Sequence, residues 1–476
     1  MPKDSAAPIL VVDLDDSLVR TDMLVESLCS ALATRWERIF GAGFALLRGR
    51  AALKAALAEE NTVNIRRLPY DAAVLDRVKA ARAAGIKTAL VTATNQNLAE
   101  AIADHLGLFD EVHGSSATLN LKGARKAAFL VERYGRGGFD YIGDSAADLA
   151  VWAEARGRIT VNIGAGLKSK VDAMGGEITH LGDKKPLLGP VLRALRPHQW
   201  AKNALVFVPL LTAQAFDGAS VLAALMAFAA FSAVASSVYL LNDLVDLGAD
   251  RAHPRKCRRP FASGDLALKH GLWLAPGLLV GGLVLAALVN MGFLLVLMGY
   301  YLVTLAYSLS LKRLPILDIC ALAALYTIRI LAGAAAIAVV PSVWLLAFSM
   351  FFFFSQAAIK RQAELVNTED DGKGVRGRGY AHGDEPVVAQ MALGSGYVSV
   401  LVMALYINTP YVQQLYSQPA WLWAICGVLL YWISRLSLIT HRGEMHDDPV
   451  IFAVRDRVSL ISLGLILMAG ILAAVG

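Results

Sequence analysis

The sequence predicts an N-terminal α/β domain followed by an all-α domain of about nine transmembrane helices. Of the 476 residues, 56% are hydrophobic, and the mean hydropathy is +0.51. These values are far above those of soluble proteins. Short apolar segments alternate with helical stretches before about residue 195, whereas long apolar runs follow residue 200. We therefore expect domains at 1–165 and 196–476, joined by a Gly-rich linker at 166–195.

Short apolar segments in the first domain end in polar residues, as the strands of a parallel sheet do. The first segment ends at Asp13 and Asp15, which are two residues apart and can point the same way. A second segment ends at Thr92, and a third ends at Asp144. Open α/β sheets bind ligands at the carboxyl ends of their strands. The pattern therefore predicts a Rossmann-type parallel sheet whose site gathers these side chains.

These motifs resemble those of the haloacid dehalogenase-like (HAD) phosphatases over about residues 8–165. The resemblance rests on the DxDxS sequence from Asp13, the strand-end Thr92, a following lysine and the GDxxxD sequence that contains Asp144. It implies that Asp13 is a nucleophile that forms an aspartyl-phosphate, and that Asp15 is the general acid and base. It also implies a helical cap between Asp13 and Thr92.

The same resemblance implies how the phosphoryl group is held. Thr92 would bind this group and Lys122 would neutralise its charge, with Lys126 as a competitor for the lysine role. The implied Mg²⁺ ligands are Asp13, Asp15, Asp144 and Asp148. The alternative is an inactive HAD fold that serves as a docking or regulatory module, because a fold does not secure an activity.

Nine apolar segments follow, and most have the roughly 20 residues that cross a bilayer. They lie near residues 202–215, 219–241, 269–288, 291–310, 316–339, 342–360, 387–408, 419–439 and 457–475. The net charge of +6 collects in alternate loops, which indicates membrane topology rather than nucleic-acid binding. The expected location is a bacterial inner (plasma) membrane, with the HAD-like domain and both active sites in the cytoplasm.

A cluster of acids follows the second apolar segment. Asp243, Asp246 and Asp250 are spaced three and four residues apart, which places them on one face of a helix. Three like charges so placed repel each other unless a cation lies between them. Mg²⁺ is the natural candidate, since it binds carboxylates together with phosphate oxygens. The alternative is a solvated helix end beside the basic run 251–259.

This half resembles the UbiA superfamily of intramembrane prenyltransferases over residues 195–476. The resemblance rests on the NDxxDxxxD sequence from Asn242 and on Tyr307 with Lys312. Where the aromatic prenyltransferases carry a second Asp-rich motif, this chain has Lys360 and Arg361. The motifs at residues 196–203, 250–254, 259–264 and 455–457 more closely resemble those of the decaprenyl-phosphate phosphoribosyltransferase branch. The expected substrate-binding residues of this half are Lys202, Asn203, Asn242, Arg259, Tyr307, Lys312, Arg329, Lys360, Arg361 and Glu364.

Arg329 lies inside an apolar segment, where an arginine is costly and faces a cavity or a partner. A buried pair with Asp318 is the structural alternative for this residue. For the two catalytic acids of this half, Asp243 and Asp246, we expect a role in stabilising the leaving pyrophosphate through Mg²⁺.

Three functions are compatible with these features. The first is a bifunctional enzyme that joins phosphoribosyl diphosphate to a polyprenyl phosphate and then removes the 5-phosphate. The second is an aromatic prenyltransferase with an accessory HAD domain, and the third is a transporter or scaffold with a regulatory HAD module. The expected partners are the two substrates and the lipid bilayer, with no nucleic acid. The sequence leaves an oligomer open.

Overall fold

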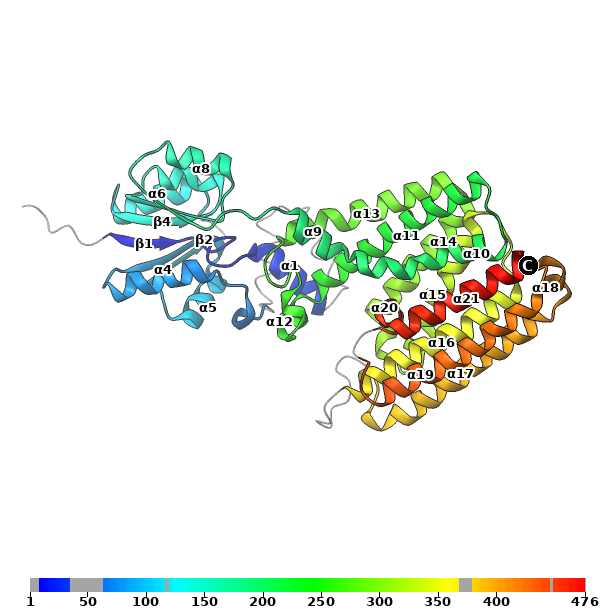
Figure 1. The fold of residues 1–476 in the computed structure, drawn as a ribbon. Helices are drawn as coiled ribbons and strands as arrows, with labels where there is room; N and C mark the ends of the chain where they lie inside the picture. The colour runs from blue at the N-terminus through cyan, green and yellow to red at the C-terminus, as the bar shows by residue number, and fades with distance from the viewer. Residues whose placement is uncertain (1–7, 35–62, 116–119, 368–378, 446–447, 476) are drawn as a thin grey trace, which may run out of the picture. The chain divides into compact units, whose positions relative to one another are not determined.

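The computed structural model describes residues 8–34, 63–115, 120–367, 379–445 and 448–475 (Figure 1). The chain divides into two compact units. The first unit comprises residues 1–195 and 239–275, and the second comprises residues 196–238 and 276–476. Residues 35–62, where most of the helical cap was expected, lie outside the described residues.

The first unit is built on a parallel sheet of six strands in the order β3-β2-β1-β4-β5-β6. The strands are β1 (Ile9–Val12), β2 (Thr88–Asn95), β3 (Glu111–Ser115), β4 (Phe139–Gly143), β5 (Gly157–Val161) and β6 (Glu177–Leu181). Val12 pairs with Leu90 on one side and with Ile142 on the other, so β1 and β4 end together, whereas β2 continues to Asn95. The strand order reverses between β1 and β4, which is where such sheets bind ligands. The predicted Rossmann-type sheet is confirmed.

Helices cover this sheet, and one stretch differs from the prediction. The helices of the α/β part are α1 (Met23–Thr34), η2 (Ile65–Arg67), α4 (Ala72–Ala83), α5 (Gln96–Leu106), α6 (Ala124–Tyr134), η3 (Ala146–Asp148), α7 (Leu149–Trp152), α8 (Ala165–Asp172) and α9 (Leu188–Leu195). The linker expected at 166–195 is wrong, because this stretch forms α8, β6 and α9. Strand β6 pairs with β5 and completes the sheet.

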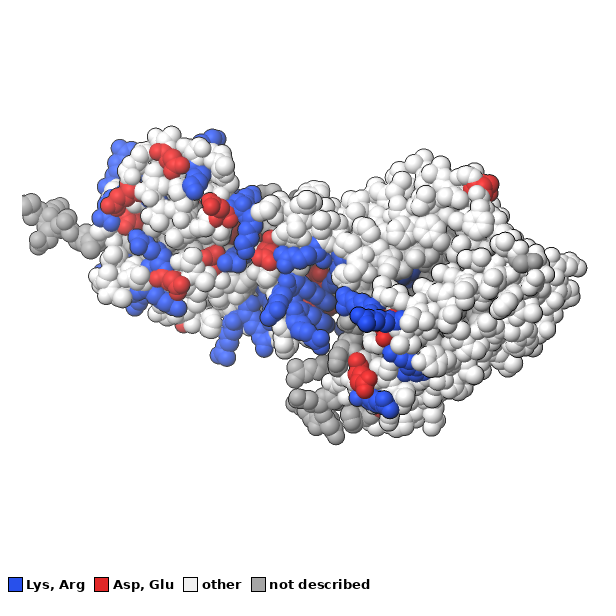
Figure 2. Space-filling model, viewed as in Figure 1, with Lys and Arg blue, Asp and Glu red and all other residues white. Residues whose placement is uncertain are grey.

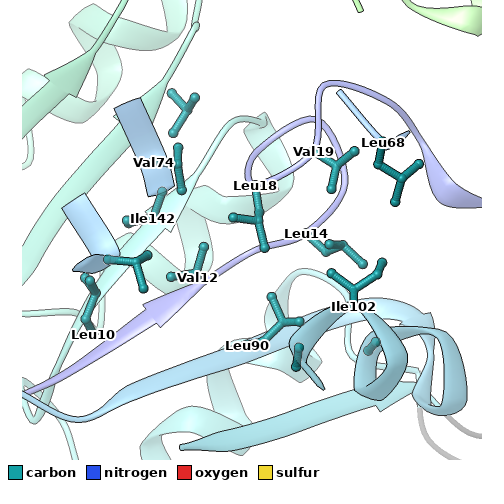
Figure 3. Packing of buried hydrophobic residues seen from close by; sticks show 14 of the residues in the cluster. Leu10, Val12, Leu14, Leu18, Val19, Leu68, Val74, Leu90, Ile102 and Ile142 are labelled. Atoms are coloured by element: carbon teal, nitrogen blue, oxygen red, sulfur yellow. The ribbon is translucent and has the colours of Figure 1, made fainter. Parts of the chain in front are cut away.

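The core of this unit follows from the alternation of side chains along β1. Leu10 and Val12 point to one face of the sheet, where they pack with Leu90 and Ile102 (Figure 3). Ile9 and Val11 point to the other face, within a second buried cluster. Successive residues of a strand face opposite sides, so a sheet covered on both faces needs apolar residues at every position. This packing fixes the end of β1, and Asp13 is the next residue along the chain.

The first unit also contains the region that carries the aspartate motif. This region includes the end of α11 (Gly218–Val245), α12 (Leu247–Ala252), η5 (Lys256–Arg258) and the start of α13 (Leu268–Val289). Glu26 of α1 forms an ion pair with Arg251 of α12, and both side chains are only 5% exposed. A Cβ at Gly264, whose φ is +74°, would lie 2.6 Å from Cβ of Arg20. The motif region therefore packs closely on the α/β part.

The second unit is helical, and eight helices among the described residues are long and apolar enough to cross a membrane. They are α11, α13, α14 (Met291–Leu309), α15 (Leu317–Ala336), α16 (Val343–Val366), α17 (Glu385–Ile407), α19 (Trp423–His441) and α21 (Arg457–Val475). The shorter elements are η4 (Pro197–Phe207), α10 (Val208–Thr212), η6 (Leu311–Arg313), η7 (His382–Asp384), α18 (Pro410–Leu415), η8 (Pro419–Leu422) and α20 (Pro449–Arg455). The segment expected as a ninth span, 202–215, instead forms η4 and α10.

The surface of this unit suits a lipid environment. Most of its visible face in Figure 2 is uncharged over the described residues, and large apolar side chains such as Val343 and Val475 are about 80% exposed. An exposed apolar face of this extent indicates membrane contact. The chain is therefore an integral membrane protein.

Within this unit, segment η4 packs tightly against α15, because a Cβ at Gly333 would lie 2.0 Å from the carbonyl oxygen of Val206.

Candidate active sites

The first candidate site lies at the ends of β1 and β4. Nζ of Lys126 donates to Oδ1 of Asp13 at 2.8 Å and to the hydroxyl of Tyr141 at 3.0 Å. The Tyr141 hydroxyl in turn donates to Oδ1 of Asp148 at 2.8 Å. All four residues are buried. Two carboxylates are thus connected through one lysine and one tyrosine, which fixes the position of the ammonium group.

The structure brings Lys126, rather than Lys122, to Asp13. Helix α6 begins at Ala124, after Gly123 with a φ of +57°. Lys126 is therefore in the first turn of the helix and faces the sheet, whereas Lys122 precedes the helix and is exposed. The contact to Asp13 is therefore made by Lys126, which the sequence offered as the alternative to Lys122.

Asp15 is held by groups other than those around Asp13. Its Oδ2 accepts a hydrogen bond from the Thr94 hydroxyl at 2.8 Å, and its Oδ1 accepts one from the Met23 amide at 2.8 Å. Thr92 is fully buried, and its hydroxyl accepts a hydrogen bond from the Thr94 amide at 3.0 Å. Thr92 and Thr94 both lie near the end of β2. Because Thr94 holds the Asp15 carboxylate, this strand end positions both Asp15 and Thr92.

Three acids of this site could hold a metal ion. Asp13, Asp144 and Asp148 each offer one carboxylate oxygen, and these oxygens lie within 4.8 Å of one another. Among the described residues this is the one such group of acids, histidines or cysteines. Asp15, which was also expected as a ligand, is not part of it, since its carboxylate faces Thr94 and the Met23 amide. Carboxylate oxygens are the ligands that Mg²⁺ prefers.

The acids of this site have raised pKa values. Burial, followed by the neighbouring Asp13 and Asp148, raises the pKa of Asp144 to about 8. Burial also raises the pKa of Asp15 to about 7, with Asp22 adding to the effect. The pKa of Asp13 rises to about 6, because burial outweighs the opposing charge of Lys126. Buried like charges that favour protons in this way also favour a bound cation.

The second candidate site is the aspartate motif. Asp243 lies near the end of α11, Asp246 lies between the helices, and Asp250 lies in α12. Helical hydrogen bonding continues across the junction, since the amide of Asp250 donates to the carbonyl oxygen of Asp246 at 2.8 Å. Nη1 of Arg259 lies 3.0 Å from Oδ1 of Asp243 and 2.6 Å from Oδ2 of Asp250. A cation does lie between two of these acids, and it is an arginine.

A cluster of cations forms a third candidate site, in the second unit. Nζ of Lys202 and Nζ of Lys360 lie 2.9 and 3.0 Å from the same oxygen of Asp448. The hydroxyl of Tyr326 donates to the other oxygen at 3.2 Å. Burial alone would raise the pKa of Asp448, but Lys360 and Lys202 outweigh it and hold the pKa below its usual range. Two ammonium groups thus share one carboxylate, which leaves an excess of positive charge.

Arg329 adds a third cation to this region. Its Nε donates to Oδ1 of Asn203 at 3.0 Å, and Nη2 donates to the Tyr300 hydroxyl at 3.3 Å. Arg329 is 5% exposed. Asn203 is oriented by the Ser232 hydroxyl at 3.1 Å. The alternative for Arg329, a buried pair with Asp318, is not what the structure has, because these partners are neutral groups and Asp318 contacts a different arginine.

That arginine is Arg361, whose side chain is completely buried. Nη2 of Arg361 lies 2.5 Å from Oδ2 of Asp318, and its Nη1 contacts Glu364. The Tyr380 hydroxyl donates to Oδ1 of Asp318 at 2.6 Å. The assignment of Arg361 and Glu364 to substrate is therefore not supported, since both are engaged in an internal ion pair. Lys360, one residue earlier on the helix, faces Asp448 instead.

The remaining predicted residues are half-buried, and the structure distributes them over both units. Asn242 lies on α11 in the first unit, whereas Tyr307 on α14 and Lys312 in η6 lie in the second. Asp448 and Tyr141 are site residues that the sequence alone does not identify. Asp448 precedes Pro449 in a short polar loop before the last span. An acid at this position is the sequence feature that could have indicated a site residue.

Comparisons with known proteins agree with a chain made of an α/β part followed by a helical membrane part. Residues 204–473 match the UbiA prenyltransferase family, and residues 10–152 match the haloacid dehalogenase-like hydrolases. An uncharacterized protein, y4nM of Sinorhizobium fredii, is 40% identical over 470 residues, which cover 98% of this chain and 90% of that protein. This relative therefore shares both halves of the chain.

Two further relatives match only part of the chain. Nodulation protein NoeC of Azorhizobium caulinodans is 39% identical over 274 residues, which cover 57% of this chain and 88% of that protein. Decaprenyl-phosphate phosphoribosyltransferase of Mycolicibacterium smegmatis is 38% identical over 200 residues, which cover 41% of this chain and 63% of that protein.

Proposed function

Because the chain belongs to the UbiA prenyltransferase family and carries a haloacid dehalogenase-like domain, we propose that it is a bifunctional membrane enzyme. The transferase half moves 5-phosphoribose from phosphoribosyl diphosphate to a polyprenyl phosphate and releases pyrophosphate. The hydrolase half then removes the 5-phosphate, which leaves polyprenyl-phosphate ribose. The similarity to a decaprenyl-phosphate phosphoribosyltransferase supports the first step.

The observation that carries the proposal for the transferase is the convergence of Lys202 and Lys360 on Asp448. These two lysines contact a single carboxylate, and Arg329 lies close enough to Lys202 for their charges to interact. Such an excess of charge is costly in a membrane protein unless an anion neutralises it. Both proposed substrates carry phosphate groups that could neutralise it, whereas an aromatic prenyltransferase has one such substrate, its diphosphate donor.

The transferase needs no nucleophile from the protein. An oxygen of the lipid phosphate forms the bond to the anomeric carbon as the bond to pyrophosphate breaks. Lys202, Lys360 and Arg329 are proposed to bind the 5-phosphate and the lipid phosphate, and Asn242 is proposed to bind the ribose. Tyr307 and Lys312 are proposed to complete the donor site. Charge stabilisation by such fixed groups is the main source of rate in reactions of this type.

The acids of the aspartate motif have the donor chemistry that Mg²⁺ requires. Asp243, Asp246 and Asp250 would hold this ion, which when bound would neutralise the leaving pyrophosphate. Two of these acids, however, contact Arg259 in the structure, so a metal ion would have to compete with this arginine for them.

The residues of the HAD-like site fit Mg²⁺, with Asp13, Asp144 and Asp148 as the proposed ligands. The bound ion would neutralise the transferring phosphoryl group. Asp13 attacks the phosphorus atom and forms an aspartyl-phosphate, while Asp15 protonates the leaving alcohol. Asp15 then deprotonates the water that hydrolyses this intermediate. Lys126 holds the carboxylate of Asp13 and neutralises the phosphoryl charge.

We place the enzyme in a bacterial plasma membrane, with both sites on the cytoplasmic side. The alternating basic loops of the sequence support this orientation, because positively charged loops are retained in the cytoplasm. Both substrates would then be reached from the side on which phosphoribosyl diphosphate is a soluble metabolite.

The test is mass spectrometry of the lipid product formed in detergent from labelled phosphoribosyl diphosphate and a polyprenyl phosphate. Wild type should yield lipid-phosphate ribose and inorganic phosphate. Asp13→Asn should accumulate the phosphorylated lipid sugar at a near-normal transfer rate, because a carboxamide cannot form the acyl-phosphate. If both proteins give the same phosphorylated product, the hydrolase half of the proposal is wrong. If neither consumes the donor, the transferase half is wrong.

A further inference from the structure

A single guanidinium nitrogen bridges two acids of the aspartate motif. Nη1 of Arg259 contacts both Asp243 and Asp250, at 3.0 and 2.6 Å. The two carboxylate side chains are only 2% and 3% exposed, whereas the Arg259 side chain is 27% exposed. One positive group therefore lies where a small cation would lie, and it reaches this place from the accessible side.

The backbone around Arg259 is well fixed, although its side chain is partly exposed. The amide of Ser263 donates to the carbonyl oxygen of Arg259 at 2.9 Å. Nε of Arg251 donates to the carbonyl oxygen of Ala262 at 3.1 Å, and Arg251 is itself paired with Glu26. A movement of the Arg259 side chain consequently does not require the loop to unfold.

A divalent cation at Asp243 and Asp250 would have to compete with this guanidinium, which contacts one oxygen of each carboxylate. Arginine stays protonated in proteins, so its charge is removed from the motif only by moving the side chain. Moving it breaks two charge-assisted hydrogen bonds, which are among the stronger kind. A metal ion alone would have to offset this loss and the repulsion by the guanidinium. A diphosphate group changes the balance, because it offers the guanidinium a bidentate partner and offers the metal further oxygens.

We propose that Arg259 is the internal counter-cation of the aspartate motif and moves onto a diphosphate group when that group and a divalent cation bind together. This role rests on the proposed function, since the diphosphate would be that of the phosphoribosyl donor. The motif then binds its metal only with a diphosphate ligand. By linkage, the metal increases diphosphate affinity by the same factor as diphosphate increases metal affinity.

The experiment measures Mn²⁺ binding to the full chain in detergent by electron paramagnetic resonance, with and without inorganic pyrophosphate. An Asp144→Asn background removes the HAD-like metal site from the measurement. Addition of Asp243→Asn reports the Mn²⁺ that pyrophosphate binds in solution. In the Asp144→Asn protein, pyrophosphate should tighten Mn²⁺ binding about tenfold or more after this correction. An unchanged affinity would overturn the proposal.

The arginine itself is tested by Arg259→Gln in the same background. This variant should bind Mn²⁺ about tenfold more tightly without pyrophosphate, because the competing charge is gone, and should lose most of the pyrophosphate effect. Arg258→Gln, the matched change at the exposed neighbouring residue, should behave as the parent. A folded Arg259→Gln protein with unchanged or weaker Mn²⁺ binding would identify Arg259 as a fixed structural partner instead.

These outcomes are separable from those of the proposed function. Should Arg259→Gln fail to fold, the comparison of the parent with and without pyrophosphate decides alone. If pyrophosphate tightens Mn²⁺ binding but labelled phosphoribosyl diphosphate is not consumed, the proposed transfer reaction is wrong and the role of Arg259 stands. If transfer occurs without any coupling of the two ligands, the role of Arg259 is wrong and the transfer reaction stands.

Discussion

Nζ of Lys126 lies 2.8 Å from Oδ1 of Asp13, and both side chains are buried. Replacement of Lys126 by Met should therefore reduce phosphate release on the order of 10²-fold or more, as expected for the loss of one strong electrostatic contact. Lys122→Met, at an exposed position, should retain activity within a few-fold. The measurement is phosphate release from the isolated phosphorylated lipid sugar. A larger loss of phosphate release in Lys122→Met than in Lys126→Met would show that Lys122 neutralises the phosphoryl group.

The neighbouring Lys360 and Arg361 should respond differently to truncation. Arg361→Ala leaves Asp318 buried without its charged partner, so it should destabilise the protein by about 3–5 kcal/mol. Lys360→Ala should instead raise the KM for phosphoribosyl diphosphate with little loss of stability, because Lys202 still pairs with Asp448. The measurements are thermal unfolding in detergent and donor kinetics. Stability should return in part when Asp318→Asn is combined with Arg361→Met.

Mg²⁺ binding at the HAD-like site should release protons at pH 7. Because burial raises the pKa of Asp144 to about 8, this acid is largely protonated at pH 7 without a metal ion. The ion requires the carboxylate form, so binding expels the proton, and the Mg²⁺ affinity should rise between pH 6 and pH 8. Calorimetry in two buffers with different ionisation enthalpies measures this release. Asp144→Asn should abolish it, whereas Asp172→Asn at an exposed acid should not. Binding without proton release would contradict the raised pKa.

The two ends of α19 should be accessible from opposite sides of the membrane. Residues 197–212 extend about 30 Å at the usual rises of 3-10 and α-helices, which is roughly the thickness of the hydrocarbon core. We expect this segment to cross the membrane together with the eight long helices, which gives nine crossings with the N-terminus inside. In a chain whose four cysteines are replaced by alanine, Gln414→Cys should react with an impermeant thiol reagent from outside and Arg442→Cys only from the cytoplasm. The opposite pattern would reverse the topology.

The strands that form the HAD-like site could be predicted because each is apolar and ends in a polar motif. Strand β6 could not be predicted in this way, since it is the edge strand and its side chains are largely exposed or half-buried. Its sequence lacks the continuous apolar run of a buried strand. The same limit explains the incorrect linker at 166–195.

The site residues divide in a similar way. Spacing along the sequence could bring Asp243 and Asp250 to one side of a helix, but it could not show that Arg259 lies between them. Nor could it separate Lys122 from Lys126, because the choice depends on where α6 begins. Ion pairs between distant residues, such as Arg361 with Asp318, depend on tertiary packing that a local pattern does not encode.

The ion pair between Glu26 and Arg251 affects how the chain can be divided for biochemical work. A transferase fragment that begins near residue 196 would lack Glu26 and would leave Arg251 without the partner that compensates its buried charge. Such a loss typically costs about 3–5 kcal/mol. Co-expression of the two pieces, or replacement of Arg251 by an uncharged residue of similar size, would be needed to recover a stable fragment. The region around Arg251 thus depends for its stability on the α/β part of the same unit.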